Sequence, residues 1–463
     1  MIAPDQVLTV AQMVAAEQRL MDAGTDVHEL MQRAGRGAAE YVRRMAAGAP
    51  VTVLCGPGNN GGDGYVVAEA LREAGGPVVV VSAMPPKTDA ARRAADLYQG
   101  PVVDADEARG AILVDCLFGS GLNRELSKQL GDLLDGLSQR HDRAVAVDLP
   151  SGIDADSGAL LAETLPHYAL CIALGAWKRA HFLMPAMAQC DEHRLVDIGA
   201  AREDGGAVLI GKPALSPPAA DAHKYRRGLV SIVAGEMAGA ARLSAHAAAY
   251  SGAGYVQMLQ RDGRPSPDWL VATEVTDGNV AGALDDARIG TVLIGPGLGR
   301  DDDARARFDG AIRAGHRAVL DADALTMLRR PLEFPAILTP HEGELRALEK
   351  AFDLDGNGAK PDRALALAKA ARAVVIAKGP DTVIAAPDGR LAFAPRASSW
   401  LSVAGSGDVL AGIVASRLAV TREPWRAACE AAWMHGEAAC LAGPAFTAED
   451  LADNVRGALA ACL

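Results

Sequence analysis

Short runs, almost all of them continuously apolar, alternate with longer alanine-rich stretches in the first 200 residues of the chain. A helical pattern covers residues 10–45, and the apolar runs that follow it occupy residues 51–54, 78–81, 112–114, 144–147 and 169–173. Strands that are buried on both faces are continuously apolar, whereas a strand with one solvated face alternates between apolar and polar positions. The pattern therefore predicts an α/β domain with a doubly wound, Rossmann-like parallel sheet.

Residues 200–221 interrupt this pattern. Gly205 and Gly206 are followed there by Pro213, Pro217 and Pro218, a composition typical of a linker. A second alternating series begins at residue 229, and it includes a predicted hairpin around residues 387–390. We therefore predict two α/β domains, over residues 1–205 and 213–463.

Composition narrows the classes of partner. The 463 residues carry a formal net charge of −12, which argues against a general binder of nucleic acid or of membrane surfaces. Seven dispersed cysteines show no zinc-binding spacing, and dispersed thiols are typical of a reducing compartment. The first residues do not read as a signal peptide, and no apolar run approaches the ~20 residues that cross a bilayer. We expect a cytoplasmic protein with small-molecule substrates, and neither nucleic acid nor membrane as a partner.

A glycine-rich string follows the first predicted strand. The sequence GPGNNGGDGY, residues 56–65, precedes an alanine-rich helix. Glycines at such a turn let backbone N–H groups approach an anion at the helix N-terminus. The string satisfies GxGxxG, but VVVVS ends the second strand where a dinucleotide-binding domain carries an acidic residue. A GK[ST] sequence is also missing, so the turn is not a P-loop.

Two further polar strings follow predicted strands of the same domain. VDCLFGSGL covers residues 114–122 and VDLPSGID covers residues 147–154. Ligands of doubly wound sheets bind at the carboxyl ends of the strands, so these loops should converge with the glycine-rich turn on one crevice. Each aspartate alone could simply cap a helix or order a turn. The three loops together favour a ligand site.

These strings, with Glu17 and the stretch LMQRAG at residues 30–35, resemble the NAD(P)H-hydrate epimerase family over residues 5–200. The resemblance implies a potassium ion held by Asn60, Asp115 and Ser151, and a hard oxygen set of this kind suits such a cation. It also implies that Asp148 contacts the substrate. The implied substrate-binding residues are Asn59, Asn60, Gly61, Gly62, Asp63, Gly119, Ser120, Gly121, Leu122, Asn123, Arg124, Glu125 and Asp148.

The family's reaction inverts C6 of a hydrated nicotinamide ring, a carbon that carries both a hydroxyl group and the ring nitrogen. Proton transfer at the hydroxyl could open either the C6–O or the C6–N bond, and reclosure on the other face inverts the centre. We expect Asp148 to be the catalytic acid/base, and both routes stay open. Lys178 also matches a family lysine, but the residues before it depart from the pattern, so we leave it out of the predicted site.

The second half carries its own ordered strings, of which GSGD at residues 405–408 is the most informative. A turn of this kind before a helix offers N–H groups to an anion and holds a carboxylate beside it. Asp408 could instead only start the helix, and His341 alone reads as a packed or capping residue. The other strings are HKYRRG (223–228), GAARLS (239–244), GPGLGR (295–300), DADAL (321–325), LTPHEGEL (338–345) and KGPDT (378–382).

Together these strings resemble the NAD(P)H-hydrate dehydratase family, which has a ribokinase-like fold, over residues 213–463. The resemblance implies Asp408 as catalytic base, ADP with Mg²⁺ as cosubstrate, NADHX and NADPHX as substrates, and a homo-oligomer. The implied hydrate-binding residues are Ala240, Gly297, His341 and Asp408. The implied nucleotide-binding residues are Lys378, Gly379, Pro380, Asp381, Thr382 and Gly407.

Two other functions fit parts of the sequence. A ribokinase-like small-molecule kinase also ends in a GSGD-like turn, although TPHEGE, KGPDT and the complete first site argue against it. A binding scaffold built on an epimerase-like domain predicts a degraded pocket. This sequence instead keeps the polar residues of the predicted pocket, which are Asn60, Asp63, Asp115, Asp148 and Ser151.

Overall fold

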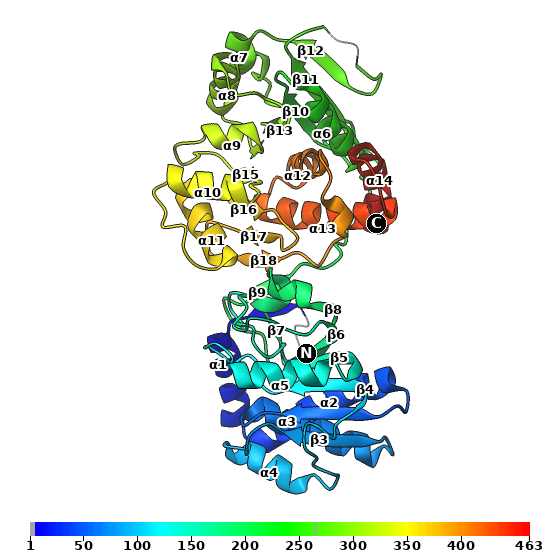
Figure 1. Cartoon of the computed structure of the whole chain (residues 1–463). Helices are drawn as coiled ribbons and strands as arrows, with labels where there is room; N and C mark the ends of the chain where they lie inside the picture. The colour runs from blue at the N-terminus through cyan, green and yellow to red at the C-terminus, as the bar shows by residue number, and fades with distance from the viewer. Residues whose placement is uncertain (1–4, 264–265) are drawn as a thin grey trace. The chain divides into compact units, whose positions relative to one another are not determined.

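The computed structural model describes residues 5–263 and 266–463, which form two compact units. The first unit is Met1–Val208 and the second is Leu209–Leu463 (Figure 1). The division between Val208 and Leu209 lies inside the stretch of glycine and proline that interrupts the sequence pattern. Each unit has its own sheet, and the two are described separately below.

The first unit contains a six-stranded sheet in which every neighbouring pair is parallel. The strand order is β3-β2-β4-β5-β6-β8, so the chain runs outward from β2 in both directions. This order confirms the predicted doubly wound sheet and places its topological switch point between β2 and β4. The strands are β2 (Val51–Cys55), β3 (Val78–Ser82), β4 (Gly110–Cys116), β5 (His141–Val147), β6 (Tyr168–Leu174) and β8 (Cys190–Val196).

Both faces of this sheet are buried, which explains the continuous apolar runs. Val53 and Val114 belong to the core under α2 and α3, whereas Leu54 and Leu113 belong to a second core that contains α5 residues. The predicted helix over residues 10–45 is two helices, because Gly24 at φ +99° interrupts it. The helices are α1 (Val10–Asp22), α2 (Val27–Ala46), α3 (Asn59–Glu73), α4 (Asp89–Leu97) and α5 (Lys128–Ser138).

Three short strands lie outside this sheet: β1 (Gln6–Leu8) pairs in parallel with β7 (Trp177–Lys178) and antiparallel with β9 (Ala207–Leu209), where the first unit ends. Two 3₁₀ helices, η1 (Arg179–Phe182) and η2 (Ala186–Gln189), follow β7. The pairing with β1 fixes Lys178 at the carboxyl edge of the main sheet, immediately after β6. This short pairing carries no apolar run that the sequence pattern could reveal.

The second unit is built on a sheet with the order β12-β11-β10-β13-β14-β15-β16-β17-β18. It is parallel from β12 to β16, and β17 and β18 then form the predicted antiparallel hairpin. The strands are β10 (Leu229–Val233), β11 (Tyr255–Gln260), β12 (Val271–Glu274), β13 (Ile289–Ile294), β14 (Ala318–Leu320), β15 (Ala336–Leu338), β16 (Val374–Ala377), β17 (Val383–Ala385) and β18 (Leu391–Phe393).

Helices cover this sheet on both faces (Figure 1). Helix α12 (Ser406–Thr421) is buried almost all round, because it lies between the sheet and α6 (Ala238–Tyr250) and α13 (Pro424–Ala442). A Cβ on Gly412 would lie 2.1 Å from the Ser244 carbonyl oxygen, so glycine is required where α12 crosses α6. The remaining helices are η3 (Asp277–Asn279), α7 (Val280–Ala283), α8 (Asp302–Ala314), α9 (Asp323–Met327), α10 (Glu342–Ala351), α11 (Lys360–Ala371), η4 (Ser399–Leu401) and α14 (Ala448–Ala461).

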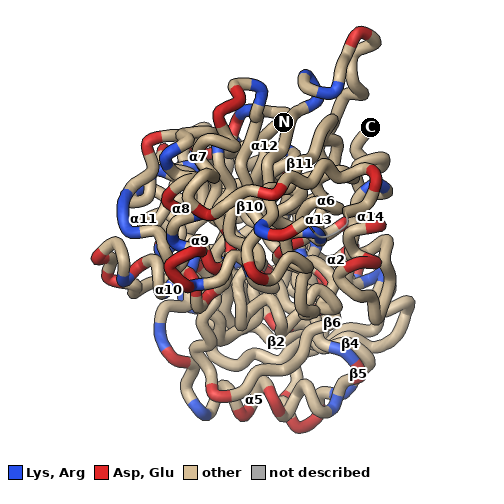
Figure 2. Tube along the Cα trace, turned by 90° about the horizontal axis from the view of Figure 1, so that it is seen from above, with Lys and Arg blue, Asp and Glu red and all other residues tan. Residues whose placement is uncertain are grey.

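Acidic and basic residues are interspersed along the chain rather than gathered by sign (Figure 2). Within residues 5–263 and 266–463, no helix combines the length and the apolar character that crossing a membrane requires.

Candidate active sites

The polar loops of the first unit meet at the carboxyl edge of its sheet. Strand β2 leads into the glycine-rich turn, β4 into residues 117–125, β5 into Asp148 and β6 into residues 175–178. The turn and the β4 loop flank the topological switch point, where doubly wound sheets bind ligands. The fold thus gathers at one edge the strings that the sequence separates by up to a hundred residues.

The glycine-rich turn is held by two close backbone approaches. A Cβ on Gly56 would lie 1.8 Å from the Leu117 carbonyl oxygen, and a Cβ on Gly61 would lie 1.9 Å from that of Gly56. No side chain caps the N-terminus of α3, which begins at Asn59 after the N-cap Gly58. Its first N–H groups are therefore available to an anion at the crevice.

Asp148 is a buried carboxylate with several partners. Its Oδ1 accepts a hydrogen bond from Lys178 Nζ at 2.5 Å, and its Oδ2 accepts one from the Ser120 N–H at 2.8 Å. Burial opposes ionisation, but the Lys178 ammonium and these hydrogen bonds bring the pKa of Asp148 below its ordinary value. Asp148 is therefore an ionised carboxylate, and hence a proton acceptor, at neutral pH.

The backbone of Asp148 is held in an uncommon conformation. Its φ is +67°, and His181 Nε2 donates a hydrogen bond to its carbonyl oxygen at 2.9 Å. The Nδ1 of His181 accepts from the Lys178 N–H at 2.9 Å, so the ring is neutral with its proton on Nε2. Burial lowers the pKa of His181 to about 3, in agreement with that assignment. His181 and Lys178 thus position Asp148 together.

Lys178 is the main site residue that the sequence analysis left out. Its side chain is only 2% exposed, and its Nζ also donates to the Leu174 carbonyl oxygen at 2.6 Å. A buried ammonium is stable only when it is paired and hydrogen-bonded, and Asp148 supplies that pairing. The signal was the match to a family lysine, which the unusual residues before it obscured.

Two further carboxyl groups surround this pair. Burial raises the pKa of Asp63 well above its ordinary value, and the charges of Asp148 and Glu17 raise it further. Burial likewise raises the pKa of Glu17, although Lys178 opposes the shift. The cluster therefore combines one ionised carboxylate with two carboxyl groups whose pKa values are raised, an arrangement that separates a base from potential acids.

Asn60 has a buried amide without partners. Among the described residues, neither its Oδ1 nor its Nδ2 has a hydrogen-bond partner. A Cβ on Gly119 would lie 3.1 Å from Asn60 Oδ1 and 2.8 Å from Asp148 Oδ2, so both side chains adjoin this glycine. An unsatisfied buried amide costs ~1–3 kcal/mol, which indicates a ligand at this position.

Asp115 and Ser151, the other residues of the predicted potassium set, are in direct contact. The Ser151 hydroxyl lies 2.7 Å from Asp115 Oδ1 and 3.0 Å from the Phe118 carbonyl oxygen. Tyr168 and two backbone N–H groups also donate to Asp115, and burial raises its pKa. The unpartnered Asn60 oxygen, with these hydroxyl and carbonyl oxygens beside Gly119, fits a hard cation such as potassium.

The remaining predicted residues of this site have different surroundings. The Asn59 amide oxygen accepts a hydrogen bond from Thr88 at the start of α4, and Gly62 is packed closely against Met31. Leu122 is buried, whereas Gly121, Asn123, Arg124 and Glu125 are exposed at the rim. Ser120 reaches the cluster through its backbone N–H.

The second unit presents its strings at the carboxyl edge of its own sheet. The loops after β10, β13, β14, β15 and β16 meet there with the N-terminus of α12. Gly297 at φ +63° accepts a hydrogen bond from the Met237 N–H at 3.0 Å, which joins the β13 loop to the turn before α6. Ala240 lies on the first turn of that helix.

Asp408 lies in the first turn of α12. Burial and the nearby Asp321 carboxylate raise the pKa of Asp408 to about 6, although Lys378 opposes the shift. A carboxylate with a pKa near the working pH is suited to general base catalysis, since it is largely ionised at neutral pH and still basic enough to take a proton.

Lys378 links the nucleotide string to this turn. Its Nζ donates to Asp321 Oδ1 at 2.6 Å and lies 3.9 Å from Glu344 Oε2. A Cβ on Gly407 would lie 3.4 Å from the same Nζ, so the ammonium adjoins the GSGD turn. Burial would lower the pKa of Lys378, but Asp321 and Glu344 raise it above its ordinary value. The structure thus holds a positive charge beside the turn.

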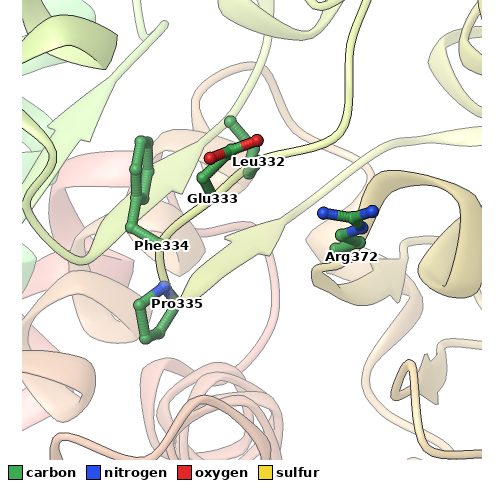
Figure 3. A pocket seen from close by; sticks show the side chains of 5 residues that line it. All are labelled: Leu332, Glu333, Phe334, Pro335 and Arg372. Atoms are coloured by element: carbon green, nitrogen blue, oxygen red, sulfur yellow. The ribbon is translucent and has the colours of Figure 1, made fainter.

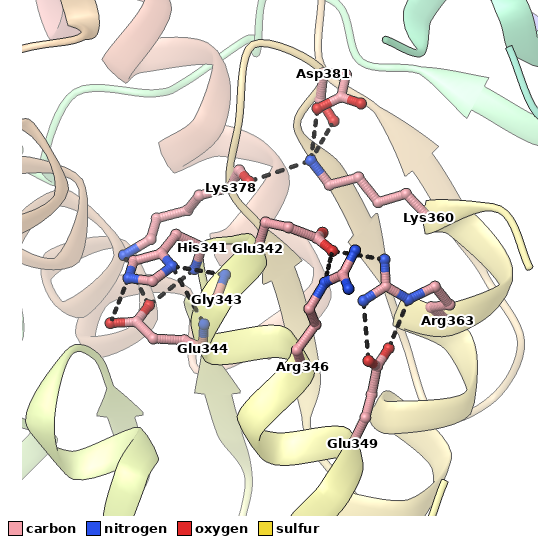
Figure 4. A network of polar contacts seen from close by, with 10 residues as sticks. All are labelled: His341, Glu342, Gly343, Glu344, Arg346, Glu349, Lys360, Arg363, Lys378 and Asp381. Carbon is pink, nitrogen blue, oxygen red and sulfur yellow. Dashed lines mark hydrogen bonds and ion pairs between the residues drawn. The ribbon is translucent and has the colours of Figure 1, made fainter. Parts of the chain in front are cut away.

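Lys360 orders the rest of the KGPDT string (Figure 4). Its Nζ donates to the Lys378 and Asp381 carbonyl oxygens and to Asp381 Oδ1, at 3.1, 3.0 and 2.6 Å. Thr382 Oγ1 donates to the Gly379 carbonyl oxygen at 2.8 Å. Lys360 belongs to α11 and lies outside every motif of the sequence, so the sequence alone does not reveal this role.

His341 caps helix α10. Its Nδ1 accepts hydrogen bonds from the Gly343 and Glu344 N–H groups, and Glu344 Oε2 accepts one from the His341 N–H (Figure 4). The capping role that the sequence analysis considered for this residue is therefore present. Its ring is 61% exposed at the same edge as Asp408, so capping leaves one face open to a substrate.

A separate hollow lies at the opposite edge of this sheet. Leu332, Glu333, Phe334, Pro335 and Arg372 line it, just before β15 and β16 begin (Figure 3). It contains none of the predicted site residues, and ligands of parallel sheets bind at the carboxyl ends of the strands. We therefore do not place the chemistry there.

The two units match two family models. Residues 27–180 match the model described as YjeF-related protein N-terminus, and residues 230–459 match the model described as NAD(P)H-hydrate dehydratase. Among solved structures, the ADP/ATP-dependent NAD(P)H-hydrate dehydratase of Bacillus subtilis, co-crystallised with ATP and Mg²⁺, is 27% identical with a TM-score of 0.48. The match covers 54% of this chain and 95% of that structure.

Curated relatives match the chain along most of its length, and each is named bifunctional NAD(P)H-hydrate repair enzyme. The relative from Thermosynechococcus vestitus is 31% identical over 94% of this chain and 92% of its own length. That from Gloeobacter violaceus is 33% identical over 92% of both chains. That from Escherichia coli is 30% identical over 91% of this chain and 87% of its own. The chain therefore belongs to the family of bifunctional NAD(P)H-hydrate repair enzymes.

Proposed function

We propose that the chain repairs hydrated nicotinamide nucleotides in two steps. Residues 1–205 epimerise the R and S forms of NAD(P)H hydrate at C6. Residues 213–463 dehydrate the S form to NAD(P)H at the expense of ADP, giving AMP and phosphate. One observation carries the proposal: each unit pairs a buried aspartate with a lysine at the carboxyl edge of its parallel sheet, and that lysine is buried in the first unit and half-buried in the second.

In the epimerase, Asp148 is the proton acceptor. In the ring-opening route, Asp148 takes the proton of the C6 hydroxyl group and a C6 carbonyl forms. The C6–N bond breaks, its electron pair remains on the nitrogen, and a neutral carboxyl group then protonates that nitrogen. In the hydroxide-loss route the neutral carboxyl group protonates the hydroxyl, water leaves, and the nitrogen lone pair stabilises C6. Both routes need one base and one acid, and Asp148 beside Asp63 supplies such a pair.

Asn60, Asp115 and Ser151 would hold potassium in this unit. The Asn60 amide oxygen supports the assignment, since it is buried and has no partner among the described residues. When bound there, the cation would supply positive charge that orients the anionic parts of the substrate. Residues Asn59 to Asp63 and Gly119 to Glu125 would form the walls of this crevice.

In the dehydratase, Asp408 accepts the C6 hydroxyl proton while the terminal phosphate of ADP is transferred to that oxygen. Phosphate then leaves, the ring nitrogen supplies the electron pair, and loss of a proton from C5 completes NAD(P)H. The backbone N–H groups of Ser406–Asp408 and the Lys378 ammonium stabilise the transferring charge.

Lys378 to Thr382 and Gly407 would hold the nucleotide, and Ala240, Gly297 and His341 the hydrate. Mg²⁺ would bind with the nucleotide, as it generally does through phosphate oxygens and one or two carboxylates. The described residues contain no group of three His, Cys, Asp or Glu that could hold a metal without such a ligand. Asp321 and Asp408 are the carboxylates beside the phosphate position.

The direct test mixes the full chain with racemic hydrate, ADP and Mg²⁺ and follows the absorbance of reduced nicotinamide. We expect both epimers of NADHX and NADPHX to be recovered, with one AMP formed for each product. A stable phosphorylated product without recovered NAD(P)H would instead indicate a ribokinase-like kinase. We also expect a cytoplasmic homo-oligomer that needs neither nucleic acid nor membrane.

A further inference from the structure

A second cavity lies within the second unit, at the edge opposite Asp408. It encloses about 470 Å³, within the range of roughly 300–1,000 Å³ that small-molecule sites occupy. It lies beside the turn that precedes β10, the C-terminal ends of α6, α12 and α14, and the start of α13. The catalytic edge instead lies beside the N-terminal ends of α6 and α12. Helix α12 alone separates the two edges by about 24 Å, at ~1.5 Å per residue.

Two arginines from α12 and α13 line this cavity and share one carboxylate. Arg417 is 7% exposed, and its Nε and Nη2 both lie 2.7 Å from Glu430 Oε2. Arg426 Nε donates to the other oxygen of Glu430 at 2.7 Å. Glu430 is itself buried, so it neutralises only one of the two guanidinium groups. The trio keeps one net positive charge at the cavity wall.

Two more arginines come from the HKYRRG string, which neither active site uses. Arg226 pairs with Asp221 at 2.9 Å, and Arg227 Nη2 donates to the Gly252 carbonyl oxygen at 3.4 Å. A Cβ on Gly254 would lie 2.1 Å from the Lys224 carbonyl oxygen, so this turn is packed tightly against the chain before β11. The packing holds both arginines at the cavity, where they add one further net positive charge.

The other walls are mostly apolar. Leu215, Pro217 and Pro218 come from the segment before β10, and Val420 and Leu459 come from the ends of α12 and α14. Guanidinium groups bind phosphate oxygens through forked, charge-assisted hydrogen bonds. Apolar walls next to such groups favour a ligand that is charged at one end and carries a hydrophobic body.

We propose that this cavity binds a phosphorylated small molecule with an apolar body, whose phosphate lies between Arg226 and Arg426. The site is distinct from both active sites. Arg417 and Glu430 fix the position of Arg426 at the wall, and the Leu215, Pro217 and Val420 side chains contact the body of the ligand. The proposal rests on the cavity and its charges and does not depend on the repair activity.

The test measures binding of phenyl phosphate to the full chain by titration calorimetry, with benzyl alcohol as the uncharged probe. The Arg226→Ala/Arg426→Ala double variant should weaken phenyl phosphate binding about tenfold or more, because both charge-assisted contacts are lost. The matched control Arg44→Ala removes an exposed arginine of α2 that is paired with Glu40, and it should leave the affinity unchanged. Both arginines of the double variant are about 60% exposed, so the variant should fold, as circular dichroism would verify.

Three results would overturn the proposal, and the first two concern phenyl phosphate itself. One is equal affinity of the double variant and the wild type for phenyl phosphate. The other is displacement of phenyl phosphate by ADP, which would place the probe at the nucleotide site. Binding of benzyl alcohol as tight as that of phenyl phosphate would likewise contradict it, since the arginines would then contribute nothing. Failure of the repair assay would leave these results unaffected.

Discussion

Asp148 is a buried carboxyl group and Asp408 is a half-buried one, and their surroundings shift their pKa values in opposite directions. Asp408 has a pKa raised to about 6, because burial and Asp321 outweigh Lys378. Asp148 has a lowered pKa, because Lys178 outweighs burial. A base must be ionised to act, so dehydration should fall about tenfold per pH unit below pH about 6. A pH profile of kcat/KM for the S hydrate measures this, and a profile that is flat down to pH 5 would contradict it.

Replacing Asp408 by Asn tests the same residue. The change preserves size but removes the proton acceptor, and loss of a positioned base costs ~10²–10⁴-fold in rate. ADP should bind as well as before or slightly more tightly, because a like charge near its phosphates is removed. Turnover and ADP titration together check this. A variant whose main defect is lost ADP binding would show that the carboxylate is structural.

Lys178→Met should strongly lower epimerase activity and leave dehydration of the S hydrate unchanged. Without the ammonium, the pKa of buried Asp148 rises, so the acid limb of any residual epimerase activity should move to higher pH. Breaking a buried pair also costs ~3–5 kcal/mol of stability, which thermal unfolding would register. Lys128→Met is the control, since Lys128 is 85% exposed and pairs with Asp132 at 3.2 Å. An unshifted pH profile would reduce Lys178 to a structural role.

Asn60→Ala should raise the potassium concentration needed for half-maximal epimerase activity by about tenfold, because one of few oxygen ligands is lost. Asn357→Ala is the control and should leave this potassium requirement unchanged, since Asn357 is an exposed residue of the second unit that donates a hydrogen bond to Asp355. Epimerase activity titrated with potassium chloride at constant ionic strength provides the measurement. An unchanged potassium requirement in Asn60→Ala would remove this residue from the proposed set.

At the residue scale, the sequence predicts those site residues that belong to a recognisable motif. Asp148, Asp115 and Asp408 each lie in a glycine-rich loop after a strand, and the fold brings those loops together. The structure adds three charged residues whose roles depend on ion pairs, and these are Lys178, Asp321 and Lys360. Each is paired with a residue at least 20 positions away in the sequence. Such long-range pairs leave no spacing pattern in one sequence.

Helices α6 and α12 meet through a glycine, which gives a prediction at the scale of elements. Gly412→Ala places a Cβ against the Ser244 carbonyl oxygen, so the helices must separate. We expect a loss of ~1–3 kcal/mol and a lower melting temperature of the second unit. Gly436→Ala is the control, because its Cβ would meet only Ala397 Cβ at an ordinary 3.5 Å. Calorimetry measures the melting temperature of the second unit in both variants. Equal melting temperatures of Gly412→Ala and Gly436→Ala would contradict the tight crossing of α6 and α12.

The sequence pattern predicts the strands that are buried on both faces, but it does not reveal the short strands or those with polar positions. β2 and β13 are buried at every position and mostly apolar, so they stand out from their surroundings. β11 and β12 lie toward the edge of their sheet and include Gln257, Thr273 and Glu274, so their polar positions hide them. The strand β7 consists of two residues and depends on its pairing with β1, which is about 170 positions away.

At the scale of the whole molecule, the chain combines two activities. Each unit has its own sheet, its own core and its own aspartate–lysine site, and the matched family models divide in the same way. The dehydratase is expected to accept only the S hydrate, so the R hydrate must pass through the epimerase first. A single substitution in one site should therefore remove one activity and leave the other intact.

The most direct test follows recovery of NAD(P)H from racemic hydrate with ADP and Mg²⁺, for the wild type and for Asp148→Asn. The wild type should recover both epimers at enzymatic rates. Asp148→Asn should recover the S fraction as fast as the wild type and the R fraction only at the slow rate of spontaneous epimerisation. If Asp148→Asn consumes both epimers as fast as the wild type, Asp148 is not the acid/base and the proposed epimerase site is wrong.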